Sequence, residues 1–107
     1  MTRGDLVSVS LPGDYGKPRP ALVIQSDVFS YLESITVLPL TTDILDASDA
    51  RISISPTPDN GLRHPSQVMI DKLGTLRRIK AGPVIGRISD DEIRLVERAL
   101  AAFLGFA

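Results

Sequence analysis

The chain has 107 residues, 12 basic and 13 acidic side chains and a formal net charge of −1. This length fits a single domain over residues 1–107, and the charge excludes a strongly basic nucleic-acid module, though not a local basic patch. There is no cysteine, which excludes disulfides and cysteine-bound zinc, and 43% apolar residues exclude a disordered chain. With neither a signal-peptide pattern nor an apolar run of membrane-spanning length, we expect a soluble cytoplasmic protein.

Alternating or continuous apolar runs predict six short strands. In chain order these are residues 6–11, 21–26, 35–41, 51–55, 66–71 and 83–88. The first alternates as a half-buried strand does, and Pro39 suggests that the third ends at an edge or a bulge. Segment 27–34 fits either a loop or one helical turn, and segment 72–82 is irregular. Asn60-Gly61 predicts a tight turn in a long loop.

The last predicted element is a helix that begins after Ser89. Ser89 and Glu92 form a capping-box pattern, and Gly105 is a plausible C-terminal stop. Apolar residues occupy two neighbouring stripes of this helix: Ile93, Val96, Leu100 and Phe103 on one, and Leu95, Ala99, Ala102 and Phe106 on the other. A helix this apolar suggests a second buried face and therefore a dimer. The element order favours a mainly β fold, a small curled antiparallel β-barrel or sheet with a C-terminal helix packed on it.

Most common catalytic motifs are missing. The chain has one histidine, His64, so neither a histidine pair nor a histidine-rich metal site is possible within one chain. There is no nucleotide-binding glycine loop and no glycine-flanked nucleophilic serine. His64 on its own is most often a solvated loop residue.

Arg19 is unusual because it lies between Pro18 and Pro20, at the entrance of a buried strand. The prolines stiffen the backbone, and a guanidinium group matches phosphate oxygens. Thr41 and Thr42 close the third strand, and adjacent second and third strands would bring them to the end of the sheet where Arg19 lies. The alternatives are that Arg19 only keeps a strand edge soluble and that the threonines only form a turn.

Four segments in order resemble one family. "RGDLVSVSLPGDYGKPRPALVIQSD", "VLPLTTDI", "SQVMIDKLGTL" and "GRISDDEIRLVERALAAFLG" are similar to the strands and closing helix of the MazF/PemK-like endoribonuclease toxins of type II toxin–antitoxin systems. The resemblance covers nearly the whole chain. It implies an SH3-like curled β-barrel, usually a homodimer, and sequence-specific cleavage of single-stranded RNA such as messenger RNA, without metal or cofactor. The 2′-hydroxyl would attack the phosphate and leave a 2′,3′-cyclic phosphate and a 5′-hydroxyl, and a cognate antitoxin with an extended acidic tail would block the site.

The family motifs assign two catalytic residues. The arginine before proline falls on Arg19, which would stabilise the charge of the transition state because arginine is a poor base. The first threonine of the pair falls on Thr41, which would bind a phosphate oxygen or orient the 2′-hydroxyl. Some relatives carry an arginine two residues before the family aspartate, where this chain has Met69. Replacements for that cation are His64, Arg63 or Lys72.

Five further residues are predicted RNA contacts. Tyr15 and Lys17 share the first loop, where a base could stack on the ring and a phosphate could meet the ammonium group, although loop packing explains them equally well. Thr42 offers a second hydroxyl. Gln67 and Asp71 match the family's glutamine and aspartate.

Three other functions stay open at this point. A CcdB-like gyrase poison has the same fold, but it lacks the Arg-Pro strand entrance. A toxin whose catalytic site has decayed would be a binding or regulatory protein, and Met69 is consistent with that. A generic SH3-like interaction module is disfavoured by the low aromatic content, 5%.

Overall fold

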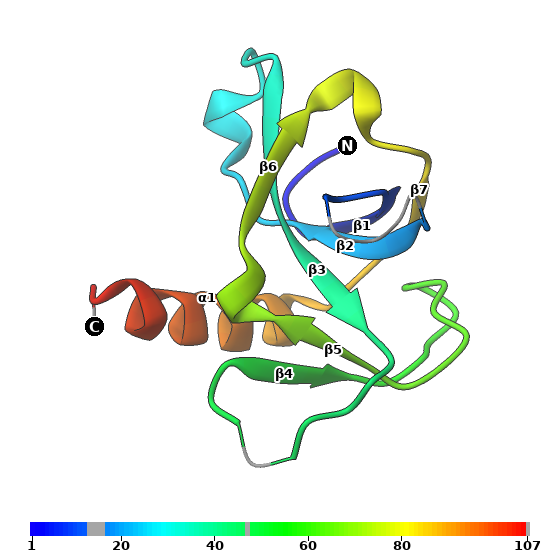
Figure 1. Cartoon of the computed structure of the whole chain (residues 1–107), viewed down its shortest axis with the longest axis vertical. Helices are drawn as coiled ribbons and strands as arrows, with labels where there is room; N and C mark the ends of the chain where they lie inside the picture. The colour runs from blue at the N-terminus through cyan, green and yellow to red at the C-terminus, as the bar shows by residue number, and fades with distance from the viewer. Residues whose placement is uncertain (13–16, 47, 107) are drawn as a thin grey trace.

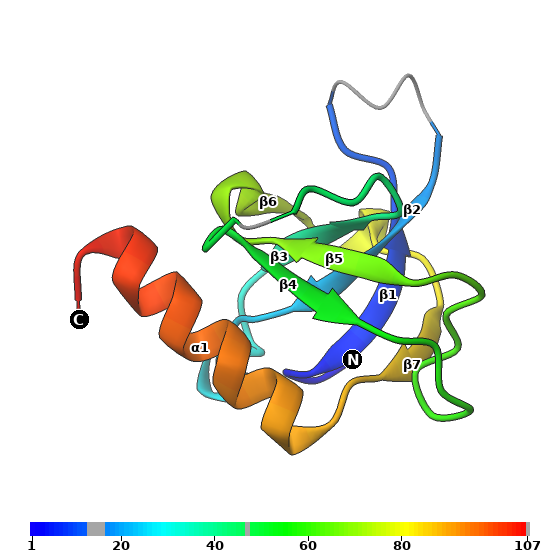
Figure 2. The ribbon, with the colours of Figure 1, turned by 90° about the horizontal axis from the view of Figure 1, so that it is seen from below.

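The structure is a computed structural model, and it describes residues 1–12, 17–46 and 48–106. The described residues form seven strands, three 3₁₀ turns and one α-helix: β1 (Asp5–Val9), β2 (Arg19–Val23), η1 (Asp27–Phe29), β3 (Ser34–Thr41), β4 (Arg51–Ile54), β5 (Ser66–Met69), η2 (Ile70–Lys72), β6 (Gly74–Arg77), η3 (Arg78–Lys80), β7 (Val84–Arg87) and α1 (Asp90–Leu104). The strands form one antiparallel sheet in the order β4-β5-β3-β2-β1-β7, with β6 also paired to β3. Figures 1 and 2 show the sheet curling on itself with α1 running along one side. The predicted mainly β fold with a curled sheet and a C-terminal helix is confirmed.

Strand β3 is the centre of the sheet because it changes partner along its length. On one side it pairs with β6 through residues 34–37 and then with β5 through residues 40–41. The carbonyl of Thr36 accepts from the amide of Ile24, so Thr36 faces the β2 side. By alternation Pro39 faces the opposite side, where β6 has ended and β5 has just begun, so its missing N–H costs no ladder bond. The predicted edge or bulge is instead a change of partner.

Strands β1, β2 and β3 are buried on both faces. Adjacent residues such as Leu6 and Val7 have no exposed surface, although they point to opposite sides of β1. One core cluster lies under α1 and comprises Leu6, Leu22, Ile24, Leu38, Leu40, Ile54, Val68, Ile70, Ile88, Ile93 and Val96. The second comprises Val7, Val9, Ala21, Val23, Ile35 and Val37, with Leu11 and Leu76 packed against it. The prediction that the first strand is half-buried is therefore wrong, because Leu6, on the face opposite Val7 and Val9, packs into the cluster under α1.

The loop after β4 connects the two ends of the sheet. The buried side chain of Asn60 shapes this loop: its amide oxygen accepts from the backbone of Thr57 and Leu62, each at 3.0 Å. Gly61 has a φ of +69°, and a Cβ there would lie 2.1 Å from the carbonyl oxygen of Ile85 in β7. The amide of Arg87 in β7 donates to the carbonyl of Asp59 at 2.8 Å. The predicted Asn-Gly turn thus lies against β7, so that the loop between β4 and β5 packs on the strand at the other end of the sheet.

Helix α1 has the predicted caps. Ser89 accepts from the backbone of Glu92, Glu92 accepts from the backbone of Ser89, and Gly105 closes the helix with a left-handed φ of +83°. The first half of the predicted stripe is buried, at Ile93 and Val96. The far end is not: Phe103 and Leu104, with Phe106 just beyond the helix, are 44–82% exposed, and Leu95 on the second stripe is 50% exposed. Figure 2 shows the C-terminal end of α1 extending beyond the sheet, which leaves the side chains at that end uncovered.

Two strand predictions need correction. Strand β2 begins at Arg19 rather than at residue 21, since the arginine pairs with Val9. Strand β6 lies in the segment that the sequence predicts as irregular, because this short strand begins with a glycine and ends at Arg77, which another arginine, Arg78, follows. The 3₁₀ turn η1 confirms the helical-turn alternative for part of segment 27–34.

Candidate active site

Arg19 is held in extended backbone at the first position of β2. Its residue pair in β1 is Val9, and the following Pro20 pairs with Ser8. The flanking prolines restrict the backbone of Arg19, and the pairing of β1 with β2 fixes it. The side chain that carries the guanidinium group is therefore attached to a rigid backbone. The predicted extended conformation of Arg19 is confirmed.

Arg19 and Thr41 lie at the same end of the sheet. Strand β2 is antiparallel to β3, with Ala21 opposite Pro39. Moving two residues along each strand, from 21 to 19 and from 39 to 41, sets Arg19 opposite Thr41. Both side chains line a hollow of about 250 Å³, called here the Thr41 groove, whose lining is Lys17, Pro18, Arg19, Pro20, Leu40, Thr41, Thr42 and Ser66. Lys17 and Thr42 therefore accompany the two residues assigned to catalysis.

Thr41 also shapes the turn that follows it. Its hydroxyl oxygen accepts from the backbone amide of Asp43 at 3.0 Å. This bond uses one lone pair and leaves the hydroxyl proton available for a phosphate oxygen. The turn interpretation and the catalytic interpretation of Thr41 are therefore compatible, because the turn fixes the direction of the hydroxyl group.

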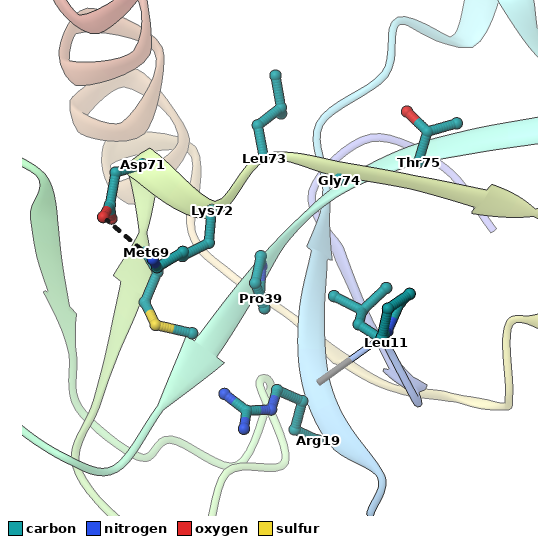
Figure 3. A pocket seen from close by; sticks show the side chains of 10 residues that line it. Leu11, Arg19, Pro39, Met69, Asp71, Lys72, Leu73, Gly74 and Thr75 are labelled. Carbon is teal, nitrogen blue, oxygen red and sulfur yellow. Dashed lines mark ion pairs between the residues drawn. The ribbon is translucent and has the colours of Figure 1, made fainter. Parts of the chain in front are cut away.

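A second, larger hollow lies on the other side of Arg19. This Met69 groove has a volume of about 560 Å³ and is lined by Leu11, Pro12, Arg19, Pro39, Met69, Asp71, Lys72, Leu73, Gly74 and Thr75. Figure 3 shows Arg19 reaching from β2 toward β3, and Met69 reaching from β5 toward the same strand. Arg19 lines both grooves, so it is the residue that they share.

Asp71 is part of a chain of three charges. It forms an ion pair with Arg51 of β4, while the Nζ atom of Lys72 lies 3.9 Å from its other oxygen. The side chain of Arg51 is only 13% exposed, whereas that of Lys72 is 60% exposed. Sequence reasoning missed Arg51, because its contact with Asp71 depends on the pairing of β4 with β5, which places Arg51 opposite Met69. A charged residue at the start of an alternating strand gives no signal of that partner.

Gln67 is buried and fully engaged by the connection that follows β3. Its amide oxygen accepts from the backbone of Leu45 at 2.9 Å, and its amide nitrogen donates to the carbonyl of Leu45 at 3.1 Å. Gln67 is also the residue opposite Thr41 in the β3–β5 pair. It thus holds residues 42–46 beside the Thr41 groove, and its predicted contact with RNA stays a prediction.

Of the three replacements predicted for the family arginine, only Lys72 lines a groove with Arg19. Arg63 and His64 are exposed in the loop before β5 and line neither groove. Tyr15, the remaining predicted RNA contact, lies outside the described residues.

The two grooves offer mainly positive charges and hydroxyl groups. Arg19, Lys17 and Lys72 carry positive charge, Thr41 and Thr42 carry hydroxyls, and the one carboxylate among the described lining residues is neutralised by Arg51. Within residues 1–12, 17–46 and 48–106, no group of three or more His, Cys, Asp or Glu side chains is placed to hold a metal ion. A site of positive charges and hydroxyl groups suits a phosphodiester.

None of the helices in these ranges has the length and hydropathy needed to cross a membrane.

Comparison with known proteins places the chain in a family. Residues 2–104 match the model of the PemK-like, MazF-like toxins of type II toxin–antitoxin systems. The chain belongs to this family.

A curated relative is similar over its full length. It is the "Probable endoribonuclease MazF" of Mycolicibacterium smegmatis, which is 44% identical over 108 residues, covering 100% of this chain and 99% of the relative.

Solved structures show the same fold at lower identity. The Mycobacterium tuberculosis toxin MazF-mt6 aligns with a TM-score of 0.81 and 23% identity, over 96% of this chain and 98% of that one. A mycobacterial endoribonuclease in complex with its cognate antitoxin aligns with a TM-score of 0.85 and 20% identity, over 100% of this chain and 97% of that one. The predicted toxin fold is confirmed.

Proposed function

We propose that this MazF-like toxin is a metal-independent endoribonuclease that cuts single-stranded RNA, such as messenger RNA, at short specific sequences. The endoribonuclease class follows from the toxin family and from the 44% identical relative. The observation that supports the site is the meeting of Arg19 and Thr41 in one groove, from strands that are paired to each other.

The reaction forms a bond from the 2′-oxygen to phosphorus and breaks the bond from phosphorus to the 5′-oxygen. The 2′-hydroxyl proton leaves to water and the 5′-oxygen takes one up, so the products are a 2′,3′-cyclic phosphate and a 5′-hydroxyl. Negative charge grows on the non-bridging oxygens in the transition state, and the guanidinium group of Arg19 stabilises it. The hydroxyl group of Thr41 donates a hydrogen bond to a phosphate oxygen. Lys17, Thr42 and, with the first loop, Tyr15 contact neighbouring nucleotides.

The same cationic grooves suit an inhibitor that carries negative charge. A relative has been solved with its cognate antitoxin. An extended acidic segment of a cognate antitoxin would neutralise Lys17, Arg19 and Lys72 and exclude RNA from both grooves.

We also propose that this single-domain chain forms a homodimer in the cytoplasm. The exposed end of α1 supports the homodimer. Phe103 and Phe106 are 53% and 82% exposed, and large apolar side chains gathered at one end of a helix are a common sign of an interface. Replacing both by serine is expected to shift the protein from dimer to monomer in analytical ultracentrifugation, whereas a wild-type monomer would contradict the proposal.

The decisive experiment is cleavage of a long single-stranded RNA in EDTA, followed by end-group analysis. Wild-type protein is expected to make discrete cuts with cyclic-phosphate and 5′-hydroxyl ends. Arg19→Ala is expected to lose this activity, whereas Arg94→Ala, which removes an equal charge from the exposed Asp91–Arg94 pair on α1, is expected to keep it. Cleavage that EDTA abolishes would contradict the metal-independent mechanism, and no cleavage by the wild type would contradict the function.

A further inference from the structure

The Met69 groove combines two cations with an apolar wall. Arg19 and Lys72 both line it, and its other walls include Leu11, Pro39 and Met69. Its volume of about 560 Å³ lies within the range of small-molecule sites, roughly 300–1,000 Å³. We propose that this groove binds the nucleotide next to the scissile phosphate, with Lys72 contacting the adjacent phosphate and Arg51 acting as a positioning residue. The proposal rests on the proposed ribonuclease function and deepens it.

Lys72 is suited to a phosphate because its ion pair is weak and its side chain is accessible. Its Nζ atom is 3.9 Å from the nearer oxygen of Asp71, and its side chain is 60% exposed. An ion pair at that separation and exposure contributes little to stability, so Lys72 can exchange it for a phosphate oxygen. Figure 3 shows the lysine turned toward Asp71 above Met69, at the side of the groove away from Leu11.

A carboxylate in a phosphate-binding groove would repel the ligand unless its charge were compensated. Arg51 provides that compensation, since it pairs with Asp71 from β4 and is only 13% exposed. It also donates to the carbonyl of Ala50 at 3.2 Å, so it is anchored to the backbone immediately before β4. With Asp71 neutralised by Arg51, the described lining of the groove is cationic through Arg19 and Lys72.

The apolar walls suit the base of that nucleotide. Pro39 lies on β3 between the two cations (Figure 3), and Met69 offers a polarisable thioether. None of the described residues that line the groove is aromatic. The base would therefore be held by aliphatic and thioether contacts rather than by stacking between rings.

The salt dependence of RNA cleavage tests the role of Lys72. Each phosphate contact to a single strand contributes about 0.7 to the slope of log(kcat/KM) against log salt concentration. Lys72→Ala is expected to reduce kcat/KM about tenfold to a hundredfold at low salt and to flatten the slope by about 0.7. Lys72→Arg should restore the slope, and Arg94→Ala, a charge loss outside both grooves, should leave it as in the wild type. An unchanged slope in Lys72→Ala, with wild-type cleavage intact, overturns this inference alone; no wild-type cleavage overturns the proposed function as well.

A pair of variants tests Arg51. Arg51→Met exposes the charge of Asp71 to the groove and is expected to lower kcat/KM at least tenfold, and adding Asp71→Asn should recover most of that loss. Both proteins are first compared with the wild type by circular dichroism, so that unfolding is recognised. A folded double variant that stays as impaired as Arg51→Met overturns the neutralising role.

Discussion

The two grooves beside Arg19 differ in size and chemistry, although they share that one residue. The Thr41 groove is about 250 Å³ and contributes hydroxyls and Lys17, whereas the Met69 groove is about 560 Å³ and contributes apolar walls and Lys72. The smaller groove has the groups that a reacting phosphate needs, and the larger one has the room and apolar surface for a base. We therefore expect a mutation in one groove to change mainly kcat or mainly KM, whereas a mutation of Arg19, which lines both grooves, changes both constants.

Arg19→Lys should have the largest effect because it acts on both grooves. Lysine keeps the charge but lacks the planar fork that can bind two phosphate oxygens at once. We expect a loss of about a hundredfold to a thousandfold in kcat, together with a higher KM, in steady-state cleavage of a labelled RNA. Retention of both constants would show that the guanidinium geometry is dispensable and that a point charge is enough.

Thr41→Val should affect only the smaller groove. Loss of a hydroxyl that bonds to a charged phosphate oxygen is expected to lower kcat about tenfold to a hundredfold with little change in KM. Thr41→Ser is the matched control, because it keeps both the phosphate bond and the turn bond to Asp43. If Thr41→Ser is as slow as Thr41→Val, the hydroxyl is not the catalytic feature and the groove comparison fails on that side.

Of the two grooves, Met69→Ala should affect only the larger one. Removing the thioether from the wall is expected to raise KM about tenfold while kcat at saturation stays near the wild-type value. Because Met69 is 8% exposed, its removal should also lower the free energy of unfolding by about 2–5 kcal/mol, measured by urea titration. Met69→Leu, which keeps the volume, separates the two effects; a lower kcat in a fully folded Met69→Leu protein would place Met69 in the reaction rather than in binding.

The sequence predicted the smaller groove better than the larger one, and local chemistry explains why. Arg19 and Thr41 stand in short motifs whose backbone is restricted by neighbouring prolines or a turn, so their position at strand ends could be predicted from nearby residues. Ser89, Glu92 and Gly105 are further cases in which a local rule was sufficient. These features depend on contacts between residues close in sequence.

The larger groove depends on pairings that no local pattern encodes. Arg51 meets Asp71 only because β4 pairs with β5, and the wall at Pro39 is open because β3 changes partner from β6 to β5. Strand β6 itself was not predicted. Long-range register is decided by the packing of both faces of the sheet, which the alternation of a single strand does not reveal.

Ser89→Ala should have the smallest effect on activity. It tests whether a loss of stability alone changes kcat or KM in the way that a mutation in a groove does. The variant removes the bond from the amide of Glu92 to the Ser89 hydroxyl, 3.1 Å long, at the start of α1. We expect the free energy of unfolding to fall by about 1 kcal/mol and Tm to fall by about 4 °C in a thermal melt. Since none of the described residues of α1 lines either groove, kcat and KM measured well below Tm should both match the wild type. A clear change in either constant under those conditions would mean that α1 is coupled to the grooves. Effects on kcat and KM would then also arise from residues that do not surround Arg19.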